Sequence, residues 1–461
     1  MAPARFGTDG IRGVANVELT AELAHTLGRA AARVLASPAF VVGRDTRRSG
    51  PLLQAAFSAG LATEGADVAD VGVLPTPGVA YLAEQRGVPG AVISASHNPF
   101  ADNGIKLLGP GGTKLAVVVE QAVEAELEAL LVDPARPPAR PRGAAVGHLA
   151  ADPAALDGYL AHLRGVTEGR RLDGLSVVLD CAHGAAAGVA PEVFVSLGAE
   201  VTAISCAPDG VNINDRCGST HPDGLRRAVV EAGADLGLAF DGDADRLLAV
   251  DHTGALADGD GLLALFAVDL AARGELAGNA VVVTVMTNLG FRLAMAERGI
   301  EVRETPVGDR HVLAALEADG LALGGEQSGH IVFRHRATTG DGILTGLALA
   351  DLMQRSGAPL ATLTAGLVDP VPQVLVNVAV REPARLAGAV VVWDAVAEVE
   401  AELGDSGRVL LRPSGTEPLV RVMVEAPTPA QAAEAARRLS AAVEGALGPL
   451  GAGGTSAAPG R

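Results

Sequence analysis

The sequence is poor in cysteine and lysine, and it has no long hydrophobic run. The three cysteines, Cys181, Cys206 and Cys217, have the spacing of neither a zinc site nor a disulfide framework. No apolar stretch approaches the roughly 18 uncharged residues of a membrane span. The amino terminus enters charged and glycine residues directly, without the apolar segment of a secretory signal. We therefore expect a soluble, cytoplasmic protein with no membrane contact.

Acidic side chains outnumber basic ones by 54 to 36, which gives a formal net charge of −18. Such a negative field opposes binding to nucleic acid, so we expect no nucleic-acid partner. An anionic small molecule stays possible where arginines reverse the sign locally. Lysine supplies only two of the basic residues, Lys106 and Lys114. We interpret Lys114 as a chance occurrence and Lys106 as a residue placed where arginine would not serve.

The chain, at 461 residues and 49% hydrophobic side chains, is long enough for several folded cores. Domains usually hold roughly 100–200 residues. Alternating strand and helix patterns favour α/β domains with mixed, mainly parallel sheets. After a Pro-rich segment near residue 370, two adjacent strands with a tight polar turn indicate a smaller α+β domain. We predict α/β domains at 1–148, 149–254 and 255–368, an α+β domain at 369–448, and a disordered tail at 449–461.

The spacing of apolar residues also predicts individual elements. Thr20 is a suitable N-cap for a helix over 21–36, and Glu22 favours its first turn. Further helices are expected at 51–64, 117–131, 185–197, 223–232, 391–403 and from 429 onward. Strands are expected at 39–43, 90–96, 175–181, 199–205, 234–243, 279–286, 299–305, 321–325, 374–380, 407–415 and 419–425.

A polar segment, SASHNPFADNGIK at 94–106, directly follows one of the buried strands. Loops at the carboxyl ends of strands are where α/β proteins usually build their sites. A serine in such a loop can act as a nucleophile or carry a phosphate, if charge and a base lie nearby. His97 and Lys106 are the neighbouring candidates. The alternative is an ordinary polar loop with His97 on the surface.

A second segment, FDGDADR at 240–246, carries three alternating carboxylates, Asp241, Asp243 and Asp245. In an extended backbone they would project to one side, where like charges are unfavourable unless a cation compensates them. Hard oxygen ligands suit Mg²⁺. An EF-hand is excluded because His252 stands at the position of its last glutamate. We predict a magnesium site, the alternative being a solvated acidic turn.

Three further segments have the composition of ligand-binding loops. RPSGTEPLVR at 412–421 places backbone N–H groups and two hydroxyls between arginines, which is typical of a phosphate site, although a surface β-turn is the alternative. GGEQSGHI at 324–331 offers a carboxylate, an amide and a hydroxyl to a polar ligand, and a hairpin turn explains it nearly as well. FGTDGIRG at 6–13 is glycine-rich, and its Arg12 is long enough to reach a phosphoryl group, although a plain turn is the alternative.

The five segments closely resemble the motifs of the α-D-phosphohexomutase superfamily, and the similarity extends from Phe6 to about Glu425. The segments at 94–106, 240–246, 324–331 and 412–421 match its phosphoserine, metal, sugar-binding and phosphate-binding loops in that order. The wording of the motifs is most similar to the bacterial branch that acts on glucosamine phosphates. The resemblance implies three related α/β domains and a smaller carboxyl-terminal domain around a central cleft. It also implies an isomerase that interconverts glucosamine 6-phosphate and glucosamine 1-phosphate through a phosphoserine and a 1,6-bisphosphate, feeding cell-wall precursor synthesis.

The same resemblance implies roles for individual residues. Ser96, and not Ser94, would carry the phosphate and complete a Mg²⁺ site with the three aspartates. The reacting end would be lined by Arg12, His97, Lys106 and Arg246. Sugar hydroxyls would be bound by Glu326 and Ser328, and the non-reacting phosphate by Arg412, Ser414, Gly415, Thr416 and Arg421. One residue departs from the family pattern, since His311 stands where tyrosine is expected.

Several alternatives remain open. Lys106 is favoured as the acid/base group because an ammonium can shift its pKa where a guanidinium cannot, and His97 is the alternative. A phosphoglucomutase or phosphomannomutase would use the same machinery on a neutral hexose. A magnesium-dependent sugar phosphatase would not need Ser96, and a non-catalytic sugar-phosphate sensor would lose nothing without it. In each case the partner is a small sugar phosphate, and the oligomeric state stays open.

Overall fold

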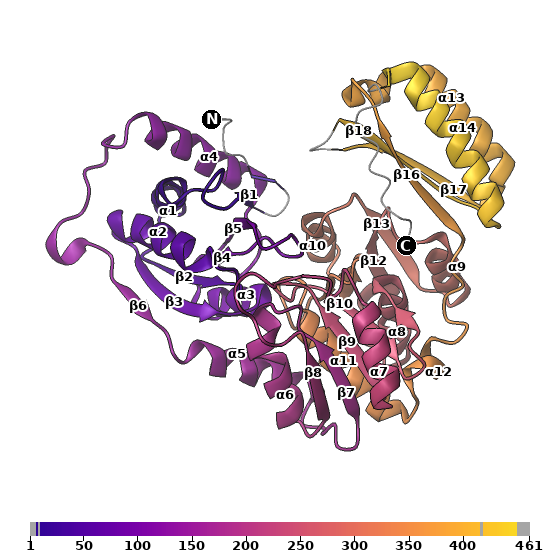
Figure 1. The fold of residues 1–461 in the computed structure, drawn as a ribbon, viewed down its shortest axis with the longest axis horizontal. Coiled ribbons are helices and arrows are strands. Elements are labelled where there is room, and N and C mark those ends of the chain that lie inside the picture. The colour runs from indigo at the N-terminus through magenta and orange to yellow at the C-terminus, as the bar shows by residue number, and fades with distance from the viewer. Residues whose placement is uncertain (1–5, 8–9, 415–417, 450–461) are drawn as a thin grey trace. The chain divides into compact units, whose positions relative to one another are not determined.

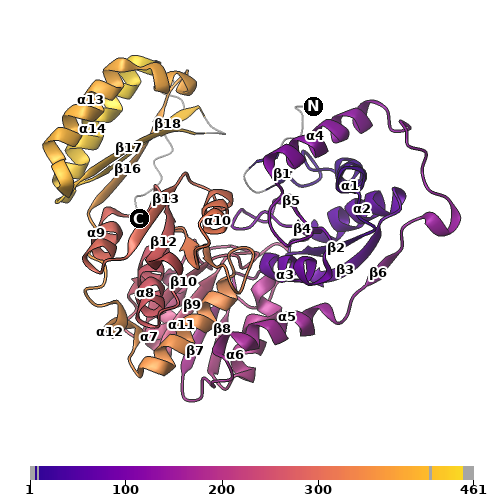
Figure 2. The same cartoon turned by 180° about the vertical axis from the view of Figure 1, so that it is seen from behind.

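The computed structural model describes residues 6–7, 10–414 and 418–449, which form four β-sheets with covering helices (Figures 1 and 2). They divide into two compact units, Met1–Met286 with Gly299–Leu367, and Thr287–Arg298 with Val368–Arg461. The predicted fold class is confirmed. The larger unit is α/β with mixed sheets, and a smaller domain lies at the carboxyl end. Within the described ranges, no helix is both long and apolar enough to cross a bilayer.

The first sheet has six strands in the order β1-β5-β4-β2-β3-β6. They are β1 (Ile11–Val14), β2 (Ala39–Arg44), β3 (Asp67–Val73), β4 (Gly90–Ile93), β5 (Asp102–Leu108) and β6 (Leu149–Ala151). The inner strands pair in parallel, whereas β5 runs antiparallel to both of its neighbours. Helices pack on both faces, with α1, α2 and α4 on one and α3 on the other (Figure 1). Their bounds are Ala21–Leu35, Gly50–Thr63, Val117–Val132 and Thr76–Arg86 respectively.

Helix α1 begins where the sequence predicts. The Thr20 hydroxyl accepts a hydrogen bond of 3.2 Å from the Leu23 amide, which satisfies one of the free N–H groups of the first turn. The buried face of the helix places Leu27 in one cluster with Phe40 and Val42 of β2. Full burial of such a side chain contributes about 1.5–3 kcal/mol. The same cluster packs the helices against β2 and β4, and β4 ends just before Ser96.

The second and third sheets complete the larger unit. The second has the order β11-β10-β9-β7-β8 and the third the order β13-β12-β14-β15, each with parallel and antiparallel pairs. The strands are β7 (Ser176–Asp180), β8 (Glu200–Ile204), β9 (Leu236–Phe240), β10 (Leu247–Asp251), β11 (Leu256–Ala257), β12 (Ala280–Thr284), β13 (Glu301–Thr305), β14 (Leu323–Gly325) and β15 (Ile331–Phe333). The helices are α5 (Ala155–Arg164), α6 (Ala190–Ser196), α7 (Asp223–Ala232), α8 (Gly259–Ala272), α10 (Asp309–Ala318), α11 (Gly342–Ser356) and α12 (Leu360–Thr364).

The smaller unit contains an antiparallel sheet in the order β16-β18-β17. Its elements are α9 (Leu289–Glu297), β16 (Gln373–Ala379), α13 (Val390–Leu403), β17 (Arg408–Pro413), β18 (Leu419–Glu425) and α14 (Pro429–Leu447). One core joins the strands to α13 and α14, with Val422 and Leu439 among its fully buried members. The Glu425 carboxylate accepts a hydrogen bond from the Leu289 amide, so α9 is held within this unit.

Some predicted elements differ from the observed ones. The strand expected at 90–96 ends at Ile93, and the strand expected at 234–243 ends at Phe240, because polar turns begin there. The helix expected at 185–197 is interrupted, and α6 starts anew beside Pro191, a residue suited to a first turn. Short 3₁₀ helices cover Gly143–Ala145, Gly165–Thr167, Ala185–Gly188, Ala277–Asn279, Pro383–Gly388 and Gly404–Ser406. The domain boundaries stay predictions, and β6 joins the first sheet just beyond residue 148.

Candidate active site

Ser96 lies in a tight turn between β4 and β5. It is buried, with 1% of its surface exposed, and its backbone has a φ of 51°. This left-handed conformation is uncommon for a residue other than glycine, asparagine or aspartate. The Ser96 hydroxyl donates a 2.5 Å hydrogen bond to Oδ2 of Asp241, which lies 145 residues away in sequence. The fold therefore brings the first two predicted motifs into direct contact.

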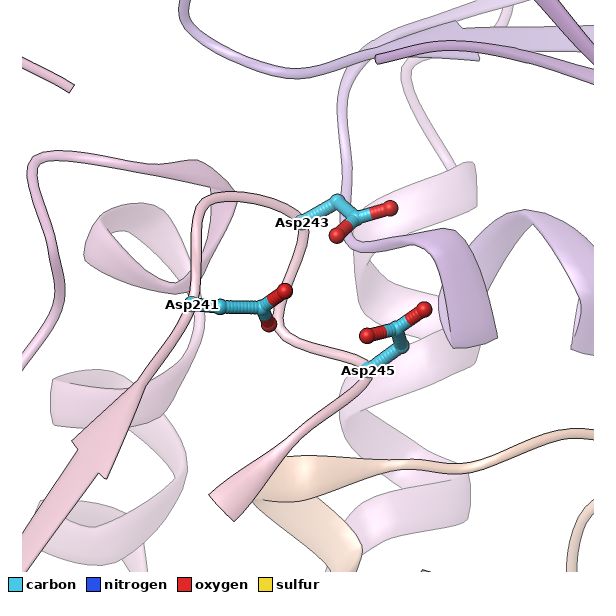
Figure 3. Close-up of side chains that lie close together, drawn as sticks. All are labelled: Asp241, Asp243 and Asp245. Atoms are coloured by element: carbon cyan, nitrogen blue, oxygen red, sulfur yellow. The ribbon is translucent and has the colours of Figure 1, made fainter. Parts of the chain in front are cut away.

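The three aspartates lie in the turn between β9 and β10, and all are buried. Their ligand oxygens lie within 4.8 Å of one another, and Figure 3 shows the carboxylates facing a common space. They converge because the backbone turns, with Ala244 at a φ of 57°, whereas the sequence pattern suggested an extended backbone. The expected grouping is therefore present, but its geometric cause is different.

The donor set at this turn fits a magnesium ion. Oδ1 of Asp243 and Oδ1 of Asp245 are buried and accept no hydrogen bond from the described residues. Buried carboxylate oxygens are unfavourable unless a donor or a cation compensates them. Three carboxylates and the adjacent Ser96 oxygen, or an oxygen of a phosphate carried there, form the hard ligand set that Mg²⁺ prefers.

The carboxylates also perturb one another. Burial, reinforced by the charges of Asp245 and Asp243, raises the pKa of Asp241 well above its usual range. Burial acts in the same direction on Asp245, but the Lys106 ammonium and His330 outweigh it and hold the pKa of Asp245 well below its usual range. One carboxylate thus keeps its charge at the expense of another. A cation would remove this conflict because it stabilises all three charges at once.

Lys106 lies within the acidic group and not in a loop. It belongs to β5, opposite Val92 of β4, so its side chain is fixed by the sheet register. Its ammonium donates a 2.6 Å hydrogen bond to Asp243 Oδ2 and lies 3.6 Å from Asp245 Oδ2. The residue is only 5% exposed. The rare lysine therefore occupies a position where its charge and its proton both reach the site.

The other residues predicted for the reacting end gather around His97. The Ser96 hydroxyl lies 3.3 Å from His97 Nδ1. Burial, and after it the charges of Arg246 and Arg12, lowers the pKa of His97 to about 4. The imidazole is therefore neutral near pH 7, which suits a hydrogen-bonding role more than a proton donor. Arg12 comes from β1, and its side chain passes over Gly104 of β5, where any Cβ would lie 2.9 Å from it.

The acidic turn approaches the Ser96 turn closely because Gly242 has no side chain. A Cβ at this position would lie 2.5 Å from the Ser96 carbonyl oxygen and 2.9 Å from the Ile213 side chain. No real Cβ tolerates such contacts without a backbone shift. The glycine in the second motif is thus required by packing between the two turns.

Glu326 and Ser328 lie in the hairpin between β14 and β15. The Glu326 amide donates to the His330 carbonyl, and one Glu326 carboxylate oxygen accepts a 3.0 Å hydrogen bond from the Gly308 amide. The Ser328 hydroxyl is buried and has no hydrogen-bond partner within the described residues. The segment is therefore a hairpin turn, as the alternative interpretation held, and it also presents a polar group without a protein partner.

The predicted phosphate residues lie in the smaller unit. Arg412 of β17 pairs directly with Arg421 of β18, so two cations face each other across the hairpin. Like charges in this arrangement destabilise a sheet unless an anion lies between them. The Ser414 amide closes the hairpin by donating to the Leu419 carbonyl. Gly415 and Thr416 lie outside the described residues.

The structure adds residues that the sequence reasoning missed. The Thr76 hydroxyl donates a 2.6 Å hydrogen bond to Asp243 Oδ2. His330, which belongs to the segment at 324–331, has Nδ1 3.8 Å from Asp245 Oδ2. Lys114 was interpreted as a chance occurrence, but its ammonium lies 2.6 Å from Asp309 Oδ1. Apart from the motif around His330, no local pattern marks these residues, because their partners lie far away in sequence.

Family models describing phosphoglucomutase/phosphomannomutase domains match the chain in four places. Domain I matches residues 3–131, domain II 157–254, domain III 258–371 and the C-terminal domain 375–442. The chain belongs to the phosphoglucomutase/phosphomannomutase family. Phosphoglucosamine mutases of Mycolicibacterium paratuberculosis and Streptomyces avermitilis are each 54% identical to it, with 96% of this chain and 99% of each relative covered.

Solved structures show the same architecture. A phosphoglucomutase/phosphomannomutase family protein from Burkholderia thailandensis is 26% identical, with a TM-score of 0.80 over 98% of this chain and 99% of that chain. The N-acetylphosphoglucosamine mutase of Aspergillus fumigatus, solved with GlcNAc-6P and magnesium, has a TM-score of 0.69 over 96% of both chains. At 19% identity, this second likeness supports the fold alone.

Proposed function

We propose that the protein is an isomerase that interconverts glucosamine 6-phosphate and glucosamine 1-phosphate. Relatives that are 54% identical over nearly their whole length are phosphoglucosamine mutases. The observation that carries the proposal is the contact between the Ser96 hydroxyl and Asp241 inside a buried carboxylate group. A serine there can accept a phosphoryl group while the surrounding charges are balanced by a metal ion and Lys106.

The reaction is a pair of phosphoryl transfers. Phospho-Ser96 gives its phosphoryl group to the free sugar hydroxyl, so the bond from Oγ to phosphorus breaks and a bond from the sugar oxygen forms. The 1,6-bisphosphate then returns its other phosphoryl group to Ser96. In each transfer the attacking hydroxyl loses a proton and the leaving oxygen regains one. Such reactions depend mainly on positioning and on neutralising the oxygens of the transferred group.

Lys106 is our candidate for the group that moves this proton. Its ammonium lies against Asp243, so it can donate to the leaving oxygen and recover the proton from the attacking hydroxyl. His97 is the alternative, but with a pKa of about 4 its imidazole is almost entirely unprotonated near pH 7 and does not hold the proton to be donated. We assign His97 to orienting the Ser96 oxygen, and Arg12 and Arg246 to the charge of the transferred group.

Asp241, Asp243 and Asp245 would hold Mg²⁺ together with an oxygen on Ser96. When bound there, the ion supplies Lewis-acid stabilisation of the negative charge on the transferred phosphoryl group. The three aspartates then fix its position, because all come from one buried turn.

The remaining predicted residues would bind the sugar phosphate. The Glu326 carboxylate would accept hydrogen bonds from the sugar hydroxyls. The Ser328 hydroxyl would donate to them or accept from them, since it has no hydrogen-bond partner among the described residues. A phosphate group would lie against Arg412 and Arg421, with Ser414 and the adjacent Gly415 and Thr416 completing its contacts. A cytoplasmic location and the absence of membrane or nucleic-acid partners stay predictions from composition.

Intact-protein mass spectrometry combined with a two-substrate assay tests the proposal. The expected result is a phosphate-sized mass increment that disappears in Ser96→Ala, together with faster turnover of glucosamine phosphate than of glucose or mannose phosphate. Faster turnover of a neutral hexose phosphate would instead assign the protein to phosphoglucomutase or phosphomannomutase activity. Net release of inorganic phosphate without need for Ser96 would indicate a phosphatase and would overturn the proposal.

A further inference from the structure

The backbone around Ser96 is held by an unusual set of hydrogen bonds. One guanidinium nitrogen of Arg47 donates to the Ser96 carbonyl at 3.1 Å and to the Asn98 carbonyl at 2.5 Å. The side-chain amide of Asn214 donates to the same two carbonyls at 2.9 and 3.0 Å. Each carbonyl therefore accepts two hydrogen bonds, and we call Arg47 and Asn214 the carbonyl clamp.

The clamp is anchored on both sides. Arg47 is fully buried and pairs with the buried Asp45 carboxylate. That carboxylate also accepts a 2.7 Å hydrogen bond from the Ser94 hydroxyl, which in turn accepts one from the Ser96 amide. Asn214 comes from the region of the second sheet, where its backbone N–H donates to the Ala182 carbonyl. The Ser96 backbone is thus fixed at its N–H and at its carbonyl by residues from two separate regions.

This support has a specific geometric purpose. At a φ of 51° the Ser96 backbone occupies a conformation that a serine rarely adopts by itself. Such conformations persist only where the surroundings enforce them. From this backbone the hydroxyl reaches Asp241, and a displacement of about 1 Å at a reacting atom can lower a rate about 100-fold.

We propose that Arg47 and Asn214 are positioning residues for phosphoryl transfer at Ser96. They contact neither the reacting atoms nor the carboxylates of the metal turn; they set the orientation of Oγ through the two carbonyls. The inference rests on the proposed function, because it concerns the rate of that transfer. It predicts a loss in kcat with little change in the affinity for sugar phosphate.

Three variants test the clamp in the full-length protein. Asn214→Gly removes the donor while permitting the φ of 58° at this position, and Asn214→Asp keeps the shape but cannot donate. Arg47→Lys keeps a charge beside Asp45 but loses the forked geometry. Arg48→Ala is the matched control, since this neighbouring side chain is exposed.

The measurements are kcat, KM, the thermal midpoint, and deuterium exchange at the amides of residues 95–98. For the three test variants we expect kcat to fall roughly 10–100-fold, with KM within about threefold of the unchanged protein and faster exchange confined to this turn. Arg48→Ala should leave kcat, KM and the exchange of this turn unchanged. Equal kcat in the Asn214 variants, or a rise in KM that matches the fall in kcat, would overturn the inference. If the unchanged protein turned over no sugar phosphate, the proposed function alone would fail, and unchanged exchange in the variants would independently remove the clamp.

Discussion

Two regions of the protein are suited to meet a phosphate group, and their chemistry is opposite. The turn that carries Ser96 in the larger unit is buried and surrounded by three carboxylates. The β17–β18 hairpin in the smaller unit is half-buried and sets Arg412 opposite Arg421. The carboxylates of the first region repel an anion and its cations attract one, whereas the second region presents two guanidinium groups, which bind phosphate in a forked geometry. The proposed function accordingly assigns the transferred phosphoryl group to the first region and the non-reacting phosphate to the second.

Removal of the Ser96 hydroxyl should have the largest effect on this contrast. Ser96→Ala deletes the atom that carries the phosphoryl group, so we expect turnover to fall by at least about 10³-fold. A coupled assay and intact mass measure the loss. Ser94→Ala is the control, and it should keep the phosphate increment. Turnover that survives in Ser96→Ala would show that the acidic turn works without a phosphoserine.

Lys106 is the cation that donates a hydrogen bond to the acidic group, at 2.6 Å from Asp243 Oδ2. Lys106→Arg keeps a charge but cannot exchange a proton near pH 7, so kcat should fall by about 10²–10⁴-fold. Lys114→Arg is the matched control, because arginine can still pair with Asp309 and the rate should stay within about twofold. A near-normal rate in Lys106→Arg would assign this lysine to charge alone.

Chelation tests whether the acidic region needs a metal ion. EDTA should lower the rate by about 10²-fold or more, and Mg²⁺ should restore it. Titration calorimetry should detect Mg²⁺ binding to the unchanged protein and weaker binding to Asp243→Asn. Full activity after exhaustive chelation would mean that the protein's own cations, Lys106 and Arg246 among them, balance the three carboxylates.

Changes in the β17–β18 hairpin, which carries Arg412 and Arg421, should affect KM, whereas changes in the Ser96 region should affect kcat. Arg421→Lys removes a forked contact to phosphate, so we expect KM for the sugar phosphate to rise about 10-fold with kcat nearly unchanged. The effect should weaken in high salt. Arg437→Lys, on the exposed surface of α14, serves as the control. A loss confined to kcat would place Arg421 at the reacting group and break the contrast.

Asp341 is a buried carboxyl outside these two regions, and we expect it to affect stability and not turnover. This is the smallest of the predicted effects. Burial raises the pKa of this carboxyl to about 6, although it accepts hydrogen bonds from Leu344 N–H and the Tyr159 hydroxyl. The folded state therefore binds the proton more tightly than the unfolded state, so Asp341 contributes stability at low pH that is lost as pH rises through about 6. The stability of the unchanged protein relative to Asp341→Asn should fall by roughly 1 kcal/mol between pH 5 and pH 7.5. A constant difference, measured by denaturant unfolding, would contradict this.

Local sequence was sufficient to predict features that local physics determines. The cap at Thr20 and the helix that follows it depend on neighbouring residues only. The motifs around Ser96 and Asp241 could also be found from the sequence, because each is a run of polar residues directly after a buried strand. This pattern can be recognised without knowledge of the tertiary structure. The rarity of lysine directed attention to Lys106 in the same way.

The contacts that organise the site could not be predicted, because they join distant residues. Arg47 lies 49 residues from the Ser96 carbonyl that it binds, and Asn214 lies 118 residues from it. Strand β5 was missed because it begins in a polar stretch, and its sheet register alone places Lys106 beside Asp243. Composition identifies the residue types, but tertiary packing selects which of them meet.

The glycine at position 242 has a consequence for how the site is acquired during folding. Its missing side chain lets the acidic turn approach the Ser96 carbonyl, so the two turns fit only as a matched pair. The serine is synthesised 145 residues before its partner Asp241. Contacts at such sequence separation form late, after the local elements. On the proposed function, a nascent chain therefore gains a Ser96 able to accept a phosphoryl group only once the second sheet has folded, because the turn that carries Asp241 follows β9 of that sheet.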